Sequence, residues 1–266
     1  MLSAMQWKRL GLAAAIAGAG VYFSSFYLPG PTEVSDDFEQ RFSRTWWFEK
    51  PHADAARIVA DPLQPTNHVA GFFLTRHDKT VHKGKRTEMK LGCVRLGDAY
   101  SYRFAALVPA GYVMEESLEN ICQWHDMPDF LLGESWRNPP LKLTIRGGRW
   151  VLHYRWSDAK VNRYLWEKQG RSELREVDLG PVVTGKWMTW EFRIHWAADA
   201  SGRLEVWHDG QLAYRQEGAT SYRDWRGPYF KMGMYKPDWS VAPEKSSVNE
   251  RHIFYDDVVV ERITSP

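Results

Sequence analysis

Residues 187–196 read WMTWEFRIHW, an alternation of apolar and polar side chains. From Trp190 onward every second residue is apolar, and the residues between them are Glu191, Arg193 and His195. Successive side chains of a β-strand point to opposite faces, so this pattern buries one face and leaves the other polar. The stretch predicts a strand of an antiparallel sheet, because such sheets commonly pack only one face on a core.

The same alternation recurs on both sides of this stretch and predicts a chain of many short strands. Gly147-Gly148 and Asp209-Gly210 each separate two such strands and predict tight hairpin turns. We expect strands at 86–94, 100–108, 119–125, 141–146, 149–156, 187–196, 203–208, 211–215 and 252–262. Beyond the N-terminal segment only short helices are expected, near 51–60 and 158–168.

Many strands joined by short turns predict an all-β fold, an antiparallel β-jelly-roll sandwich preceded by one N-terminal hydrophobic helix. The 14 Trp, 12 Tyr and 12 Phe suit this fold, because flat rings fill a sandwich core, although some rings could instead line a sugar-binding groove. The expected organisation is a signal anchor or signal peptide at 1–30, a linker at 31–40 and the jelly-roll domain at 41–266.

The N-terminal segment is expected to export the domain. Lys8 and Arg9 precede residues 10–28, a run of 19 residues without charge, close to the ~20 that span a bilayer. The basic flank places the N-terminus in the cytoplasm and the body outside. An uncleaved anchor uses the whole run, whereas a cleaved signal peptide would end near 17–20. Both alternatives predict a periplasmic or secreted domain, and the anchor attaches it to the membrane.

The formal net charge of +2 names no partner, but the local distribution is informative. Basic residues gather between Arg76 and Lys90, and such a cluster attracts polyanions. A solvated basic loop before a strand explains the same residues. An acidic polymer is the expected partner, and nucleic acid is not.

The two cysteines, Cys93 and Cys122, do not form a CxxC pair, so a zinc site is not expected. Alternation turns both away from the polar faces of their strands, which places them in one layer. They could pair in an oxidising compartment if their Cα atoms come within about 7 Å.

Two short stretches carry polar side chains suited to chemistry. Alternation places Arg86, Glu88 and Lys90 on one face of their strand, although a solvent-facing strand would look the same. In the QWH stretch at the end of strand 119–125, Gln123 and His125 share a face opposite the intervening tryptophan. An imidazole can accept a proton, and an amide can donate a hydrogen bond to a carboxyl group.

A third stretch, YFKMGMY at 229–235, alternates in the same way. Lys231, Gly233 and Tyr235 fall on one face, opposite a phenylalanine and two methionines. We interpret the glycine as open space between the two polar side chains, where a ligand could approach the backbone. Packing alone explains this pattern less well than it explains the other two.

The chain has a resemblance to a known family, which rests on these three stretches, on the pattern W…WEFRIHWAADASGRLEVWHDG at 187–210 and on FYDDVVVER at 254–262. It resembles the heparin lyase I-like polysaccharide lyases, whose wider group includes glucuronan lyases. The resemblance covers roughly residues 40–262. It implies a concanavalin A-like jelly roll and β-elimination of a uronic-acid polysaccharide.

The resemblance also implies roles for single residues. His125 would be the base and Tyr235 the acid, with Tyr235 in both roles as the alternative. Gln123 and Arg86 would contact the uronate carboxyl group, and Lys231 would assist at the reacting sugar. Further substrate-binding residues would be Glu88, Lys90 and Lys85.

These residue types suit the reaction. Elimination removes the weakly acidic C5 proton of a uronate while charge builds on its carboxylate, which donors such as Arg86 and Gln123 would stabilise. A base must reach C5, and an acid must protonate the leaving O4. The reaction requires no cofactor. A structural Ca²⁺ ion stays an open alternative, and its ligands are unknown because the family's calcium ligands cannot be matched to positions of this sequence.

Two rival functions fit the same fold. A glycoside hydrolase needs two carboxylates flanking the bond, and the nearest stretch, EVDLGP at 176–181, lacks the second glutamate. A non-catalytic carbohydrate-binding domain would use the same basic stretch and aromatic rings, and it would bind uronans without forming an unsaturated product.

Overall fold

The computed structural model describes residues 30–162 and 172–264. The predicted hydrophobic helix at 10–28 lies outside these ranges. Among the described residues, no helix is long and apolar enough to cross a membrane. The chain divides into two compact units, residues 1–30 and 31–266, and every described strand and helical turn belongs to the second.

In its described residues, the second unit has fifteen strands, with a few single-turn helices between them. The strands are β1 (Val34–Asp36), β2 (Trp47–Glu49), β3 (Ala56–Ala60), β4 (His68–Thr75), β5 (Arg86–Cys93), β6 (Ala99–Val108), β7 (Glu119–His125), β8 (Leu141–Arg146), β9 (Arg149–Ser157), β10 (Ser172–Pro181), β11 (Lys186–His195), β12 (Arg203–His208), β13 (Gln211–Glu217), β14 (Tyr229–Tyr235) and β15 (Glu250–Ile263). The helical turns are η1 (Ala53–Ala55), η2 (Phe130–Leu132), α2 (Asp238–Val241) and η3 (Pro243–Lys245).

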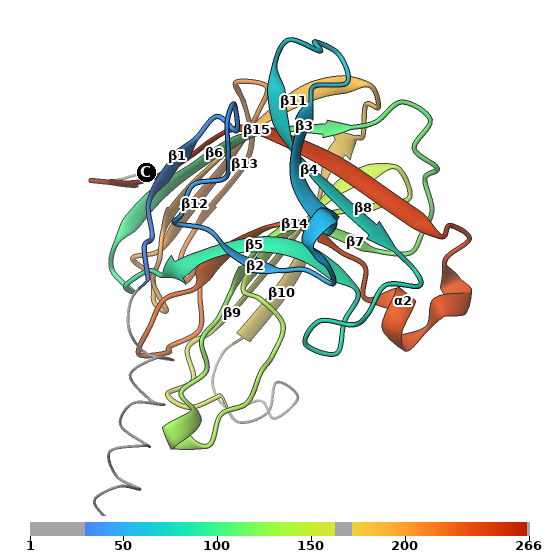
Figure 1. The fold of residues 1–266 in the computed structure, drawn as a ribbon. Helices are drawn as coiled ribbons and strands as arrows, with labels where there is room; N and C mark the ends of the chain where they lie inside the picture. The colour runs from blue at the N-terminus through green and yellow to red at the C-terminus, as the bar shows by residue number, and fades with distance from the viewer. Residues whose placement is uncertain (1–29, 163–171, 265–266) are drawn as a thin grey trace, which may run out of the picture. The chain divides into compact units, whose positions relative to one another are not determined.

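The strands form two antiparallel sheets that face each other, as Figure 1 shows. One sheet has the order β13-β12-β11-β6-β15-β4-β3, with β1 paired to β15. The other has the order β10-β9-β8-β7-β14-β5-β2. The predicted all-β sandwich is therefore confirmed. Strands distant in sequence lie side by side, so β14 separates β5 from β7.

Aromatic side chains fill the space between the sheets. Trp124, Trp190 and Trp196 are almost completely buried, and the rings of Trp124 and Phe192 lie 4.7 Å apart. The stretch that decides the fold becomes β11, whose inward side chains meet this core and whose register with β6 is unbroken. Many of the tryptophans therefore pack in the core, whereas Trp47, Trp136 and Trp225 stay about half exposed.

Each strand named from alternation is present, with bounds within two residues of those expected. The expected helix at 51–60 is wrong, because it contains only the η1 turn and then β3. The linker at 31–40 is also wrong in part, since β1 pairs with β15 and Phe38 is fully buried. The helix expected at 158–168 falls mostly outside the described residues. Strands β1 to β4 and β10 had not been expected.

Candidate active site

The three predicted stretches become adjacent strands in the middle of the seven-stranded sheet. Arg86 on β5 lies opposite Tyr235 on β14, and Lys231 on β14 lies between Lys90 and Gln123. Residues directly opposite each other in a sheet share a face. The polar side chains of the three stretches therefore meet on the outer face of this sheet, away from the other sheet.

A network of ion pairs holds this face together, and we name it the Lys231 cluster (Glu49, Arg86, Glu88, Lys90 and Lys231). Lys231 Nζ is buried and lies 2.7 Å from carboxylate oxygens of both Glu49 and Glu88. Arg86 Nη1 lies 3.3 Å from Glu88 and 3.5 Å from Glu49, and Lys90 Nζ lies 2.9 Å from Glu49. Three cations meet two carboxylates, so the cluster carries an excess positive charge.

Glu49 is the carboxylate that all three cations share. Burial alone would raise its pKa, but the attraction of Lys231 and Lys90 outweighs burial and lowers the pKa of Glu49 to about 2. Glu49 is therefore ionised at any ordinary pH. No sequence pattern pointed to this residue, because β2 is too short to show alternation.

Three of the predicted site residues, one catalytic and two substrate-binding, have other partners in the structure. Glu88 accepts hydrogen bonds from Arg86 and Gln123, so its assignment to substrate binding does not fit: a carboxylate that holds these donors repels an anionic polymer. Gln123 is equally buried, at 2% exposed, but its amide is neutral and does not repel the polymer. Lys231 is completely buried, so it acts on the face through Glu49 and Glu88. Lys85 donates to the backbone carbonyl of Asp78 and is held within its own loop.

Tyr235 and Arg86 form a stacked pair at one end of the face. The guanidinium carbon of Arg86 lies 4.1 Å from the centre of the Tyr235 ring. Burial raises the pKa of Tyr235, and the nearby Arg86 opposes this only in part. The phenol therefore keeps its proton at neutral pH. Gly84 is the residue that admits the ring, since a Cβ there would come within 2.7 Å of it.

Gly233 does not provide open space for a ligand, as the alternation had indicated. A Cβ at this position would lie 2.3 Å from the carbonyl oxygen of Thr87 and 2.9 Å from the Cα of Glu88. The backbone there also has a φ of 132°, which favours glycine. The glycine is required by the close approach of β14 and β5.

His125 lies at the other end of the face. Its Nδ1 lies 3.1 Å from the backbone oxygen of Asp126, and a carbonyl can only accept a hydrogen bond. Nδ1 therefore carries the proton of the neutral ring, and Nε2 is left to accept one. Tyr229 stacks on the imidazole and Trp136 packs edge-on, with ring centres 5.6 and 5.5 Å away.

His125 and Tyr235 share the face but are not adjacent on it. His125 lies opposite Tyr229, and Tyr235 is six residues further along β14. At about 3.3 Å per residue, this places their backbones roughly 20 Å apart along the strand. Lys231 and Gln123 lie between them, so a sugar bound over Gln123 would have one candidate proton-transfer group on each side.

Behind His125 lies a second set of charges, which we name the Arg137 cluster (Asp126, Glu134, Arg137 and Asp224). The buried guanidinium of Arg137 lies 2.7 Å from Asp126, 3.0 Å from Glu134 and 2.6 Å from Asp224. Three carboxylates meet one cation, so this cluster carries excess negative charge. Burial, opposed by Arg137 and aided by repulsion from Asp126, raises the pKa of Asp224 to about 8.

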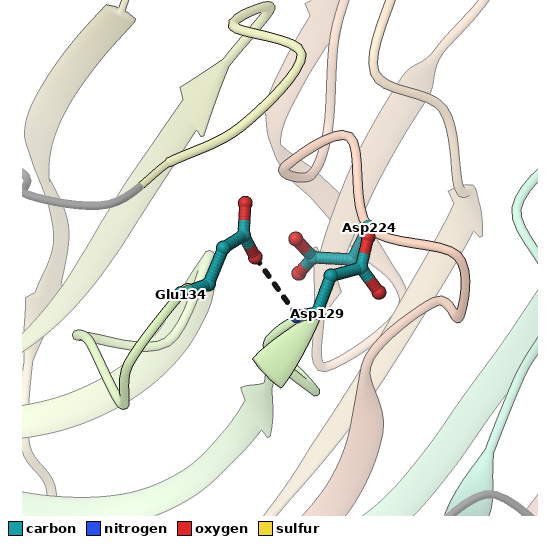
Figure 2. Close-up of side chains that lie close together, drawn as sticks. All are labelled: Asp129, Glu134 and Asp224. Atoms are coloured by element: carbon teal, nitrogen blue, oxygen red, sulfur yellow. Dashed lines mark hydrogen bonds between the residues drawn. The ribbon is translucent and has the colours of Figure 1, made fainter. Parts of the chain in front are cut away.

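Asp129, Glu134 and Asp224 bring carboxylate oxygens within 4.8 Å of one another, as a calcium site would require (Figure 2). These oxygens already accept hydrogen bonds from N–H donors. Both oxygens of Asp129 accept from the backbone of Trp225, and both oxygens of Asp224 accept from Arg137. Glu134 Oε2 accepts from the backbone N–H of Asp129. The group does not fit a calcium ion, because the Arg137 guanidinium already pairs with both Glu134 and Asp224.

The prediction for the cysteines is wrong for one of them. Cys122 packs in the core as expected, but Cys93 lies opposite Tyr229 and therefore on the face of His125. A β-bulge between the pairs of Tyr229 and Lys231 inserts a residue in β5 and reverses its alternation. Both thiols are free.

A cavity of about 670 Å³ lies elsewhere in the described part of the chain. It lies at one end of strands β6, β11, β12 and β15 of the eight-stranded sheet and is lined by Asp98, His195, Arg203 and Arg262, among others. Its charged groups pair with neighbours, for example Arg262 with Asp98 at 2.5 Å. None of the predicted chemistry lies there, so we place the site on the open outer face of the other sheet.

The fold and this face define a jelly-roll protein with a cationic surface and two groups able to transfer protons. Comparison with known proteins agrees with that class: residues 38–259 match the polysaccharide lyase family, and the chain belongs to it. This match does not distinguish the heparin lyase I-like group, which the sequence resembles, from the rest of the polysaccharide lyases. A search of curated proteins found no match.

Solved structures of lyases share the fold. The endo-β-1,4-glucuronan lyase of the fungus Trichoderma reesei is 18% identical with a TM-score of 0.70, over 85% of this chain and 94% of that one. The family 7 alginate lyase AlgAT5 is 14% identical with a TM-score of 0.54, over 82% and 94%. Alginate lyase A1-II′ is 12% identical with a TM-score of 0.56, over 82% and 94%.

Proposed function

We propose that the protein cleaves a uronic-acid polysaccharide by β-elimination on the outer face of the seven-stranded sheet. The observation that carries this is the meeting of Arg86, Gln123, His125 and Tyr235 on one face with excess positive charge. Membership of the polysaccharide lyase family and the similarity to a glucuronan lyase and to alginate lyases support a uronate polymer as substrate.

In this mechanism the uronate carboxylate lies against Arg86 and Gln123, where negative charge accumulates as the C5 proton leaves. Gln123 Nε2 donates one hydrogen to Glu88 and keeps a second for the substrate. His125 accepts the C5 proton through Nε2, and Tyr235, which keeps its proton, protonates the leaving O4. Lys231 maintains the charge balance beneath the face through Glu49 and Glu88.

A version in which Tyr235 serves both roles draws support from one observation. Tyr235 lies directly opposite Arg86. His125 of β7 lies opposite Tyr229, which is six residues from Tyr235 along β14. The C5 proton and the O4 atom belong to neighbouring atoms of one sugar, so a single phenol could reach both.

The test uses purified protein and a panel of glucuronan, alginate and heparin-like chains, with ultraviolet absorbance of the unsaturated product as the readout. Tyr235→Phe should lower turnover about 100- to 10,000-fold while polymer binding persists. His125→Ala should do the same if the imidazole is the base, and should cost less than about tenfold if Tyr235 serves both roles. If the protein binds these polymers but forms unsaturated product from none of them, the lyase proposal is wrong and a non-catalytic carbohydrate-binding domain takes its place.

For the N-terminal segment we propose an uncleaved anchor at 10–28 that holds the domain outside the cytoplasm, where such polymers occur. The support is the uncharged run after Lys8 and Arg9. Membrane fractionation of the full chain before and after alkaline extraction tests it: a fully soluble domain that lacks the segment would show cleavage instead.

A further inference from the structure

The polar row through Gln123 continues beyond the predicted site. On one side of Gln123 is Lys231, and on the other is Lys142 of β8, followed by His153 of β9 and Glu176 of β10. Adjacent strands are about 4.8 Å apart, so Lys142 is the next side chain for a polymer that crosses the strands. Leu141 and Leu143 on either side of it point into the core, which leaves Lys142 on the outer face.

Lys142 differs from Lys90 and Lys231, because no described residue supplies a counter-ion to it. Within residues 30–162 and 172–264, no carboxylate forms an ion pair with its ammonium group at the 4.0 Å limit. Glu176, the carboxylate that attracts Lys142, is already paired with Arg146 at 2.7 Å and His153 at 3.2 Å. Lys90 and Lys231, by contrast, both have carboxylate partners within 3 Å.

The surroundings make the missing partner costly. Burial and the repulsion of Arg155 outweigh the attraction of Glu176 and lower the pKa of Lys142 to about 8. A half-buried ammonium without a counter-ion destabilises the folded protein, and hydrophobic packing alone would favour an apolar residue here. An anionic ligand brought to this position would supply the missing charge.

We propose that Lys142 binds the carboxylate of a uronate that neighbours the one being cleaved, and so forms a second subsite on the β8 side of Gln123. The inference rests on the proposed uronate polymer, which carries carboxylates at regular intervals. A chain that places one carboxylate between Arg86 and Gln123 and runs toward β10 brings the next over Lys142. Removing this charge should therefore affect polymers more than single sugars.

The experiment measures equilibrium binding of glucuronan and alginate oligosaccharides by calorimetry in the Tyr235→Phe background, so that turnover does not interfere. Lys142→Met keeps the apolar stem and removes the charge. We expect it to weaken oligosaccharide binding about 10- to 100-fold, as for loss of one charged hydrogen bond. Binding of monomeric glucuronate should not change, and Lys142→Arg should keep most of the affinity.

Lys186→Met is the matched control, because Lys186 is exposed on the other sheet and pairs with Asp209. It should leave binding unchanged. Lys142→Met should unfold at the same or a higher urea concentration than its parent, which excludes misfolding as the cause of weaker binding. Affinity within twofold of the parent, or equal losses for Lys142→Met and Lys186→Met, would overturn the subsite.

The two proposals fail in different ways. If no uronan yields unsaturated product with the wild-type protein but oligosaccharides still bind through Lys142, the proposed lyase reaction is wrong and the proposed subsite is supported. If unsaturated product forms and Lys142→Met binds oligosaccharides as tightly as its parent, the proposed subsite is wrong and the proposed reaction is supported. If no oligosaccharide binds at all, the subsite is overturned together with its assumed ligand.

Discussion

The Lys231 cluster and the Arg137 cluster use the same kinds of side chain in opposite proportions. In the first, three cations share two carboxylates, and the side chains of Arg86 and Lys90 remain 12% and 26% exposed. In the second, three carboxylates surround Arg137, whose side chain is only 3% exposed. The first leaves positive charge where a polyanion can reach it, whereas the second keeps negative charge beneath the surface.

The difference teaches how one sheet can be both rigid and attractive to an acidic polymer. Excess positive charge at a surface is neutralised by an arriving anion, so it favours binding. Excess negative charge at the same surface would repel that anion, and here it is buried and partly protonated instead. The Arg137 cluster serves to fix the segment that carries His125, because Asp126 belongs to it.

The largest effect should come from breaking the buried cluster. Arg137→Met leaves three carboxylates without their cation, and removal of one partner from a buried charge network costs about 3–5 kcal/mol. We expect this loss in the free energy of unfolding, measured with urea. Arg103→Met is the control, because the exposed pair of Arg103 with Glu261 should contribute less than about 1 kcal/mol. Equal losses in the two variants would contradict the comparison.

Breaking the exposed cluster should instead affect the reaction. Arg86→Ala removes the donor that faces the substrate carboxylate, and loss of one such donor typically lowers turnover about 100- to 1,000-fold. We also expect weaker binding, because the carboxylate is charged before the reaction begins. Steady-state kinetics on the preferred uronan measures both effects. Retention of more than a third of wild-type kcat/KM would exclude Arg86 from the site.

Low pH should reveal the contribution of Glu49, the shared carboxylate of the Lys231 cluster, to the free energy of unfolding. The folded pKa of Glu49, about 2, lies below its ordinary value of 4.5, so Glu49 stabilises the protein above pH 4.5 and this contribution is lost as the pH falls toward 2. The difference corresponds to about 3 kcal/mol. In Glu49→Gln the free energy of unfolding should fall less between pH 4.5 and 2 than in the wild-type protein. Parallel profiles would contradict the assignment.

An effect similar in size to that of Arg137→Met should appear at higher pH, in the same buried cluster. The folded pKa of Asp224, about 8, lies above its ordinary value of 3.8, so its contribution is complete below pH 3.8 and is lost as the pH rises through 8. Asp224→Asn stays neutral, so its stability relative to the wild-type protein should rise by about 5 kcal/mol between pH 4 and 8, because each unit of pKa difference corresponds to about 1.4 kcal/mol. A constant difference between the two proteins over that range would show that Asp224 is ionised in the fold.

Alternation along single strands was enough to predict most of the sandwich and the shared face of Arg86, Gln123 and Lys231. It failed where a strand was too short or too uniformly apolar to alternate. Strand β2, with Glu49, has three residues, and the HVAGFFLT stretch of β4 is an almost continuous apolar run. It also failed at Cys93, where a bulge reversed the phase of β5.

The sequence by itself determined which side chains face out of each strand, because the period of a strand is a local property of the chain. Only the tertiary structure decided which strands became neighbours, because pairing joins residues more than a hundred positions apart, such as Arg86 and Tyr235. That pairing turned Glu88 from a binding residue into a buried counter-ion and brought Glu49 to Lys231. It also left Lys142 beside Gln123 with no carboxylate partner among the described residues, since a cation's environment is set by the strands on either side of its own.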